Sequence, residues 1–407
     1  MGLSMSMGEW SHHLHSLIWQ VGCFPSFGTE SQEMEVIAMV NKRNWEKVEE
    51  LDPRREAEFV REFASALHKK FVGQEEAVRS VVEVLQVHTA GMCASSRPVA
   101  NLLFLGPTGC GKTRLVETAA EILFGRSSAV IKIDCAEFQH DHEIAKLIGS
   151  PPGYLGHRDT RPLITQEALD ALHGPNVKLS FLLFDEIEKA SETLWQLLLG
   201  ILDKATLTLG DNRTVDFSNT VIFMTSNLGG RAITEKLSGG YGFVSQAKCD
   251  DASLDQKIEQ TALDAARKKF SPEFINRIDR IVVFRPLTGD QLDEVLGLEL
   301  NSVQQRLDRS AKSPCPIQVS DSGRRFLLRE GTDPRYGARH LKRAIERRLV
   351  YPLANLISTH QVEQDQPISI DWDGCSTHLE FCKSRETLLT STPQADGMAA
   401  TKSPVLR

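Results

Sequence analysis

The stretch Gly106-Pro-Thr-Gly-Cys-Gly-Lys-Thr113 decides the fold of this chain. It fits the phosphate-binding pattern G-x-x-x-x-G-K-[ST] at every fixed position. The apolar run Ala100–Leu105 before it predicts a buried strand, and Lys112–Phe124 after it has helical spacing. A strand, a glycine-rich turn and a helix form an anion cradle, because backbone N–H groups and the helix N-terminus point at the anion. We therefore expect nucleotide phosphates to bind here.

Each part of this loop has an expected role. Lys112 would reach the β- and γ-phosphates, and the Thr113 hydroxyl would bind Mg²⁺. Cys110 suits a reducing compartment, typical of the cytoplasm, and is expected to be a small tolerated residue, with a redox switch as the alternative. The remaining loop residues would contact the phosphates: Pro107, Thr108, Gly109, Cys110 and Gly111.

A second apolar strand, residues 179–184, leads directly into Asp185 and Glu186. Such a strand would deliver both carboxylates beside the phosphate loop. Asp185 is expected to hold Mg²⁺ through its water shell, and Glu186 to polarise the attacking water as a general base. Asn227 follows the next strand and would hold the water from the other side. A turn residue that caps a strand is the alternative for Asn227.

The pattern along the chain predicts an α/β fold with a central parallel sheet flanked by helices, because apolar strands alternate with helices. A β-hairpin is expected over residues 206–217, where Gly-Asp-Asn gives a turn signal. Further strands are expected at 129–133, 220–224 and 280–284, and helices within 53–90 and over 162–172 and 193–202.

After Pro286 the pattern changes to a small, mainly helical C-terminal domain with a terminal β-hairpin. Helices are expected over 290–309, 322–329 and 339–357, a short strand over 316–319, and hairpin strands over 368–372 and 378–381. The expected organisation is a largely disordered leader (1–52), a large ATPase domain (53–285), the small domain (286–384) and a disordered tail (385–407).

Composition excludes several classes of protein. The chain has 407 residues and a formal net charge of −7, which argues against a dedicated nucleic-acid binder. No run is long and apolar enough for a membrane span. The eight cysteines lack paired spacing, so neither a zinc site nor a disulfide framework is indicated.

Hydrolysis also needs positive charge against the γ-phosphate in the transition state. Arg277, in Phe274-Ile-Asn-Arg-Ile-Asp279, and Arg339, at a predicted helix start, are the two candidates. From its sequence context alone, each arginine is expected to be a surface salt-bridge partner.

Eight motifs occur in one order and together resemble the second ATPase module of the ClpB-type Clp unfoldases, of the AAA+ superfamily. The resemblance covers about residues 55–382, and the chain resembles a single-module form. The motifs are the stretches 71–78, 106–113, 153–156, 184–189, 213–217, 225–229, 274–279 and 337–339.

The resemblance implies a P-loop NTPase that uses ATP and Mg²⁺. Val72 and Gly73 would line the adenine pocket. Arg277 would be an arginine finger that reaches the neighbouring subunit's site, and Arg339 would couple the small domain to the γ-phosphate. A finger acting in trans implies a homo-hexameric ring. The implied activity is unfolding or disaggregation of proteins, without nucleic-acid or membrane partners.

The resemblance also assigns a substrate-handling loop, Gly153-Tyr-Leu-Gly156. Its glycines would give it room to move, and Tyr154 with Leu155 would grip an unfolded or aggregated polypeptide without sequence preference. A tyrosine packed on its own domain is the alternative for Tyr154.

Other functions stay open at this point. Protease-linked relatives carry a hydrophobic tripeptide where this chain has Tyr241-Gly-Phe243, so a subunit of a Clp-type protease is an alternative, although a loop folded on its own domain is favoured. An AAA+ remodeller of one specific complex is another. ClpB-type proteins also carry an N-terminal domain, a first ATPase module and a coiled coil, for which we expect no counterpart in these 407 residues, so docking to a Hsp70-type chaperone stays an open alternative.

Overall fold

The fold is that of a computed structural model, which describes residues 52–53, 55–150, 162–174, 177–230, 232–233, 251–310, 315–333, 336–362 and 367–383. The chain divides into two compact units, Met1–Glu56 and Ala57–Arg407. Every helix and strand below belongs to the second unit. Among the described residues, no helix combines the length and apolar character needed to cross a membrane.

A five-stranded sheet forms the centre of residues 57–285 within the described residues, in the order β2-β3-β6-β1-β7. All of its neighbouring pairs are parallel, as predicted. Strands β1, β3 and β6 are almost wholly buried, which explains why their sequences are mostly apolar. The strands are β1 (Ala100–Leu105), β2 (Ile131–Asp134), β3 (Ser180–Asp185), β6 (Thr220–Ser226) and β7 (Arg280–Val283).

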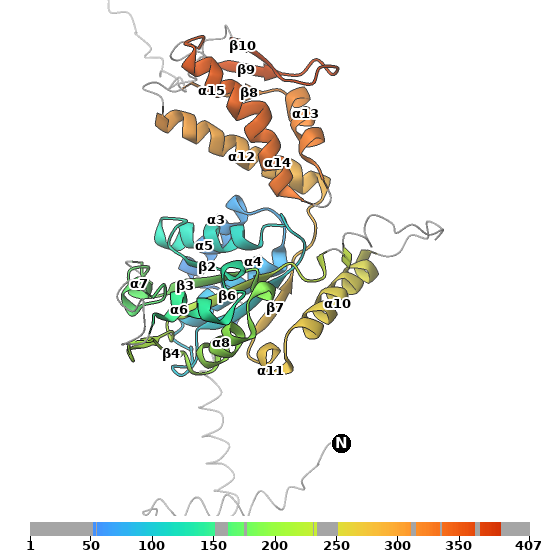
Figure 1. The fold of residues 1–407 in the computed structure, drawn as a ribbon. Coiled ribbons are helices and arrows are strands. Elements are labelled where there is room, and N and C mark those ends of the chain that lie inside the picture. Colours follow the sequence, from blue (N-terminus) through green and yellow to red (C-terminus); the bar gives the residue numbers. More distant parts are fainter. Residues whose placement is uncertain are drawn as a thin grey trace, which may run out of the picture. The chain divides into compact units, whose positions relative to one another are not determined.

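Alternate strand residues enter two separate cores, one on each face of the sheet. Leu102 and Phe104 pack with α3 (Glu58–Lys70), α4 (Glu75–Thr89) and α5 (Lys112–Phe124). The intervening Leu103 and Leu105 pack with α8 (Glu192–Lys204) and α10 (Asp251–Lys269) on the opposite face. Figure 1 shows α3 and α5 on one side of the sheet and α8 on the other. The predicted flanking helices are therefore confirmed.

Shorter elements connect these layers. Strands β4 (Thr206–Thr208) and β5 (Thr214–Asp216) pair antiparallel, so the expected hairpin is present. The other short elements are η1 (Cys135–Glu137), η2 (Asp141–Glu143), α6 (Ile144–Ile148), α7 (Gln166–Asp170), η3 (Ile187–Lys189) and α11 (Pro272–Ile275).

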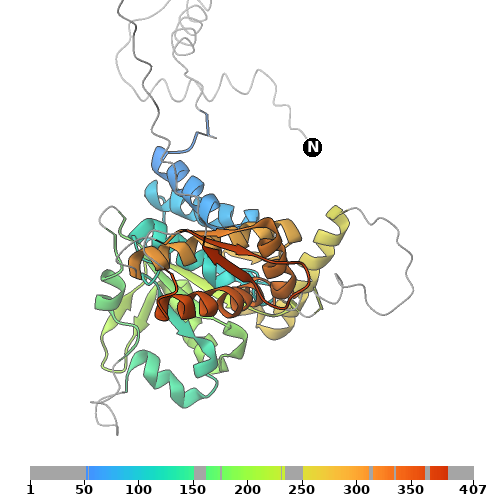
Figure 2. The same ribbon diagram turned by 90° about the horizontal axis from the view of Figure 1, so that it is seen from above.

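The C-terminal region is mainly helical and ends in the expected antiparallel strands, β9 (Ile368–Asp371) and β10 (Glu380–Lys383). Strand β8 (Ile317–Val319) joins β9 in parallel, so the hairpin belongs to a three-stranded sheet. Figure 2 shows the red strands among the orange and red helices of this region. Those helices are α12 (Gly289–Ser310), α13 (Asp321–Gly331), α14 (Ala338–Ile345), η4 (Glu346–Val350) and α15 (Tyr351–Ser358).

Two predicted helices differ from the observed ones. The helix expected over 162–172 is reduced to α7, because the extended residue Thr165 caps its start and accepts a hydrogen bond from the N–H of Ala168. The N–H groups of Leu163 and Ile164, before this cap, donate to the carbonyls of Lys146 and Leu147. The helix expected over 339–357 contains the π-helical turn η4. Pro352 follows that turn and lacks an N–H, so regular α-helical hydrogen bonding cannot continue through it.

Candidate functional site: a nucleotide pocket

The phosphate loop has the strand–turn–helix context that its sequence predicts, between β1 and α5. Gly106 and Gly109 have positive φ angles of +145° and +78°. A Cβ at Gly109 would lie 1.9 Å from the carbonyl oxygen of Tyr336, and one at Gly106 would lie 2.5 Å from that of Phe284. Both positions therefore require glycine, for conformation and for space.

Lys112 begins α5 and is only 7% exposed. Its ammonium donates to the carbonyl oxygens of Gly106 and Pro107, each at 2.8 Å, and to Asn227 Oδ1 at 2.9 Å. Three acceptors offset the cost of burying this charge. These hydrogen bonds fix the Lys112 ammonium against the loop backbone. The ammonium belongs to the first residue of α5, and anions bind favourably at a helix N-terminus.

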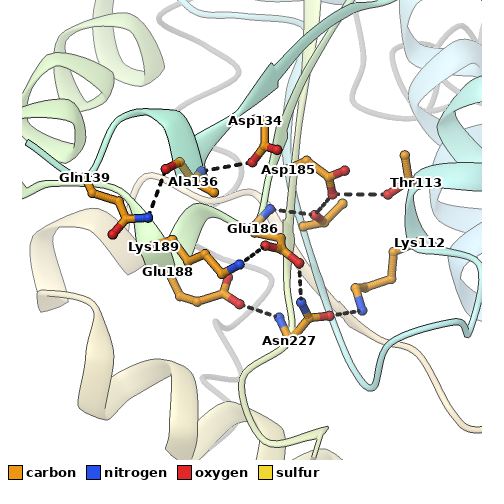
Figure 3. A network of polar contacts seen from close by, with 11 residues as sticks. Lys112, Thr113, Asp134, Ala136, Gln139, Asp185, Glu186, Glu188, Lys189 and Asn227 are labelled. Carbon is orange, nitrogen blue, oxygen red and sulfur yellow. Dashed lines mark hydrogen bonds and ion pairs between the residues drawn. The ribbon is translucent and has the colours of Figure 1, made fainter. Parts of the chain in front are cut away.

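Asp185 ends β3 and gathers three donors, of which Thr113 is labelled in Figure 3. Its Oδ1 accepts from the hydroxyls of Thr113 at 3.1 Å and Thr225 at 2.5 Å, and Lys132 Nζ lies 3.1 Å from Oδ2. Burial, the largest single influence, raises the pKa of Asp185, but the Thr225 hydrogen bond and the Lys132 ammonium bring it below its ordinary value. Mg²⁺ prefers such hydroxyl and carboxylate oxygens, so Thr113 and Asp185 fit a magnesium site.

Glu186 lies beside Asp185 in a left-handed conformation, with φ 57°. Its Oε1 accepts from Asn227 Nδ2 at 3.1 Å, and its Oε2 is ion-paired with Lys189. Because Asn227 Oδ1 also accepts from Lys112, one amide bridges the loop lysine and the candidate general base (Figure 3). The backbone N–H of Asn227 is held in turn by Glu188 Oε1, at 3.0 Å.

These side chains share one cavity of about 410 Å³. Val72 and Arg339 line it together with Lys112 and Glu186, so four predicted site residues from distant segments meet there. The other predicted residues on its wall are Thr108, Gly109, Cys110, Gly111, Thr113, Asp185 and Asn227. Pro107 reaches the site through its carbonyl oxygen, which accepts from Lys112.

The start of α14 contacts the phosphate loop directly. The N–H of Ala338 donates to the carbonyl oxygen of Gly109 at 3.1 Å, and Gly337 turns into the helix with φ 50°. A Cβ on Gly337 would lie 2.9 Å from that same oxygen. This contact brings Arg339 to the nucleotide pocket, as the sequence motif predicts.

Arg277 lies elsewhere: among the described residues, it is outside the lining of this cavity. Its Nη2 is 3.5 Å from Asp203 Oδ2. The buried side-chain amide of Asn101 donates to the carbonyl oxygens of Arg277 and Leu202, which fixes the turn that carries the arginine. This placement does not support a role for Arg277 in the pocket of its own subunit. The role in a neighbouring subunit stays a prediction.

The remaining predictions concern Gly73, the residues at 154–155 and 241–243, and the role of Cys110. Gly73 adjoins Val72, and a Cβ there would lie 2.8 Å from Gln291 Nε2. The residues predicted to grip the polypeptide, Tyr154 and Leu155, and the tripeptide at 241–243 lie outside the described residues. Cys110 is buried and donates to the Pro107 carbonyl, and burial raises the pKa of its thiol, which favours the tolerated-residue interpretation.

Sequence reasoning missed three residues that contact the acidic pair: Lys132, Thr225 and Lys189. Lys132 could be found only from the adjacency of β2 and β3, which the sequence does not reveal. Lys189 is three residues after Glu186, a spacing visible in the sequence, but the η3 turn that brings the two together was not expected.

Fold and site define a P-loop nucleotide-binding protein. A family model described as "AAA domain (Cdc48 subfamily)" matches residues 97–281, and one described as "C-terminal, D2-small domain, of ClpB protein" matches residues 287–370. The chain is 38% identical over 308 residues to an ATP-dependent Clp protease ATP-binding subunit ClpC of Staphylococcus epidermidis, covering 76% of this chain and 36% of that protein.

Solved structures agree with this assignment. A closed state of Hsp104 with ATPyS and FITC casein has a TM-score of 0.66 and 26% identity, covering 80% of this chain and 52% of that one. An extended Saccharomyces cerevisiae Hsp104:casein complex has a TM-score of 0.67 and 28% identity, covering 80% and 53%. The chain therefore belongs to the Clp/ClpB-type AAA+ ATPases and corresponds to their second ATPase module. It spans about a third to a half of the length of these relatives.

Proposed function

We propose that the chain hydrolyses ATP and uses the energy to unfold or disaggregate proteins, which it threads through a homo-hexameric ring. The observation that carries this proposal is the continuous contact from Lys112 through Asn227 to Glu186, beside the pair Thr113 and Asp185. Residues proposed to bind phosphate, to bind Mg²⁺ and to act as general base line one cavity, which supports the proposal.

In this proposal Val72 and Gly73 bind the adenine, and the loop 107–113 binds the phosphates. Thr113 and Asp185 hold Mg²⁺, which neutralises phosphate charge when bound. Glu186 takes the proton of the attacking water, and Asn227 orients its carboxylate. Arg339 stabilises negative charge on the nucleotide from α14.

Assembly and substrate handling complete the proposal. Arg277 acts in the site of a neighbouring subunit. Its place outside the lining of its own pocket, among the described residues, supports this role. Tyr154 and Leu155 grip the polypeptide. Both solved Hsp104 structures contain casein, which supports an unfolded protein as the substrate. A cytoplasmic location belongs to the same proposal.

A second candidate is the unfoldase subunit of an ATP-dependent protease. The name of the ClpC relative, an ATP-binding subunit of Clp protease, favours it. Casein cleavage that requires both this chain and a Clp-type peptidase, and that is lost when residues 241–243 are replaced, would establish this candidate.

ATP turnover by the purified chain, with and without casein, tests the main proposal. We expect hydrolysis that casein stimulates, and a loss of about a hundredfold or more in Glu186→Gln with nucleotide binding retained. Glu192→Gln, an exposed glutamate on α8, is the matched control and should keep the wild-type rate. Normal turnover in Glu186→Gln would remove Glu186 from the catalytic role.

A further inference from the structure

Lys189 contacts Glu186 from within the same tight turn. The backbone N–H of Lys189 donates to the carbonyl oxygen of Glu186 at 2.9 Å, which closes η3. The side-chain ammonium of Lys189 then returns to Glu186 Oε2 as an ion pair. Lys189 therefore contacts Glu186 through both its backbone N–H and its side-chain ammonium.

The two carboxylate oxygens of Glu186 have different partners. Asn227 Nδ2 donates to Oε1, and Lys189 pairs with Oε2 (Figure 3). One donor on each oxygen sets the plane of the carboxylate, while each oxygen keeps lone-pair capacity for a further hydrogen bond. A general base needs both properties: a fixed direction and a free acceptor site.

Lys189 contacts Glu186 without lining the cavity among the described residues. Glu186, Asn227 and Lys112 line the cavity, whereas Lys189 is outside its lining among the described residues. The hydrogen bond to Glu186 and the nearby charges of Glu186, Glu188 and Asp134 raise the pKa of Lys189, so the ammonium remains charged. Among the described residues, the contact of Lys189 with the cavity thus runs through Glu186.

We propose that Lys189 is a positioning residue for ATP hydrolysis, which holds the Glu186 carboxylate in the orientation that accepts a proton from the attacking water. This inference rests on the proposed function of Glu186. It predicts that loss of the Lys189 charge slows the chemical step and leaves nucleotide binding unchanged.

The competing interpretation is that Lys189 only stabilises its turn. The side chain is 47% exposed, and ion pairs this accessible contribute little to folding. Lys189→Met should therefore fold with a melting temperature close to that of the wild type. A purely structural role would then leave ATP turnover unchanged.

The test compares Lys189→Met and Lys189→Arg in the full chain. We expect Lys189→Met to lower kcat by about tenfold, because a misplaced catalytic group is costly, while KM and the affinity for a fluorescent ADP analogue stay within about twofold. Lys189→Arg keeps the charge and should restore most of kcat. The matched control is Lys146→Met, since Lys146 also pairs with a glutamate three residues before it, Glu143, away from the cavity.

A double-mutant cycle with Glu186→Gln separates action through Glu186 from any other effect. If Lys189 acts through Glu186, adding Lys189→Met to Glu186→Gln changes the residual rate by less than about twofold. An equal loss in both backgrounds, or an unchanged kcat in Lys189→Met, would overturn the inference. Absence of hydrolysis in the wild type would instead overturn the proposed function itself.

Discussion

The side-chain amide of Asn227 joins two charged groups that come from different parts of the sequence. Its oxygen accepts from Lys112, at the start of α5, and its nitrogen donates to Glu186, after β3. An amide suits this place because it offers an acceptor and a donor at once, whereas a carboxylate would repel Glu186. The chemistry of one residue thus couples the phosphate loop to the candidate base.

The Thr225 hydroxyl likewise joins two groups of the candidate site, Asp185 and Glu186. Its buried hydroxyl donates to Asp185 and accepts from the N–H of Glu186. Thr225→Val keeps the shape and removes both hydrogen bonds, so we expect a loss of about 1–3 kcal/mol in unfolding free energy and slower ATP turnover. Urea unfolding and steady-state hydrolysis measure the two effects.

Thr220→Val is the control for this change, because Thr220 is a buried threonine at the opposite end of the same strand, β6. Its turnover should match that of the wild type. Equal hydrolysis rates in both variants would show that the Thr225 hydroxyl does not organise the acidic pair.

At the residue scale, the sequence allows most of the site to be predicted, because the loop residues and Asp185 with Glu186 are consecutive. Lys132 escaped prediction because its contact with Asp185 depends on strand order. The contact of Lys189 depends on the left-handed conformation of Glu186, which no propensity of glutamate indicates.

Among the elements, β9 is tied to α13 by one carboxylate. Asp371 Oδ1 accepts from the hydroxyls of Ser320 and Ser322 and from the N–H of Trp372. These hydrogen bonds lower the pKa of Asp371 from 3.8 to about 2. Because the folded-state pKa is depressed, the stabilisation is present above the unfolded value of 3.8 and is lost as the pH falls toward about 2.

We therefore expect Asp371→Asn to lower the melting temperature at neutral pH. The difference from the wild type should shrink as the pH falls through this range. Thermal unfolding followed by circular dichroism at several pH values measures it. A constant difference at all pH values would show that the ionisation of Asp371 does not contribute.

Two helical glycines differ in the space around them. A Cβ at Gly331, the last residue of α13, would lie 2.6 Å from Leu341 Cδ1 and 2.8 Å from its Cα. A Cβ at Gly297 in α12 would meet only Arg324 Nη2, at 4.0 Å. The first glycine allows α13 and α14 to pack closely, and the second does not serve this purpose.

Gly331→Ala should accordingly destabilise the chain by about 1–3 kcal/mol, because Leu341 must move. Gly297→Ala should stabilise it by about 0.5–1 kcal/mol through helix propensity alone. Denaturant unfolding of both variants gives the comparison, and equal effects of the same sign would contradict this account of α13–α14 packing.

Element type was predictable where the apolar pattern is long and unbroken, as in β1 and α5. The prediction of element type was wrong where backbone N–H groups form hydrogen bonds with a distant segment, as at Leu163 and Ile164. The pairing of β8 with β9 also escaped prediction, because a three-residue strand carries too little pattern to reveal its partner.

For the whole molecule, the proposed ring makes a specific prediction about Arg277. Arg277→Ala and Glu186→Gln should each be nearly inactive alone. Mixed rings should regain part of the wild-type rate, because an intact Glu186 in one subunit then faces an intact Arg277 from its neighbour. Hydrolysis measured against the mixing ratio tests this.

Arg306→Ala is the control, because Arg306 is an exposed arginine that also pairs with a carboxylate, Glu346, and should keep the wild-type rate. A mixture that stays inactive, although fluorescence energy transfer shows that subunits exchange, would argue against a finger acting in trans.

The most direct test of the proposed activity is ATP-dependent reactivation of a heat-aggregated reporter enzyme by the purified chain, with Tyr154→Ala in parallel. The account predicts recovery by the wild type, and ATP hydrolysis without recovery by Tyr154→Ala. A wild type that hydrolyses ATP but recovers no reporter, or a Tyr154→Ala variant that recovers it fully, would contradict threading by this chain.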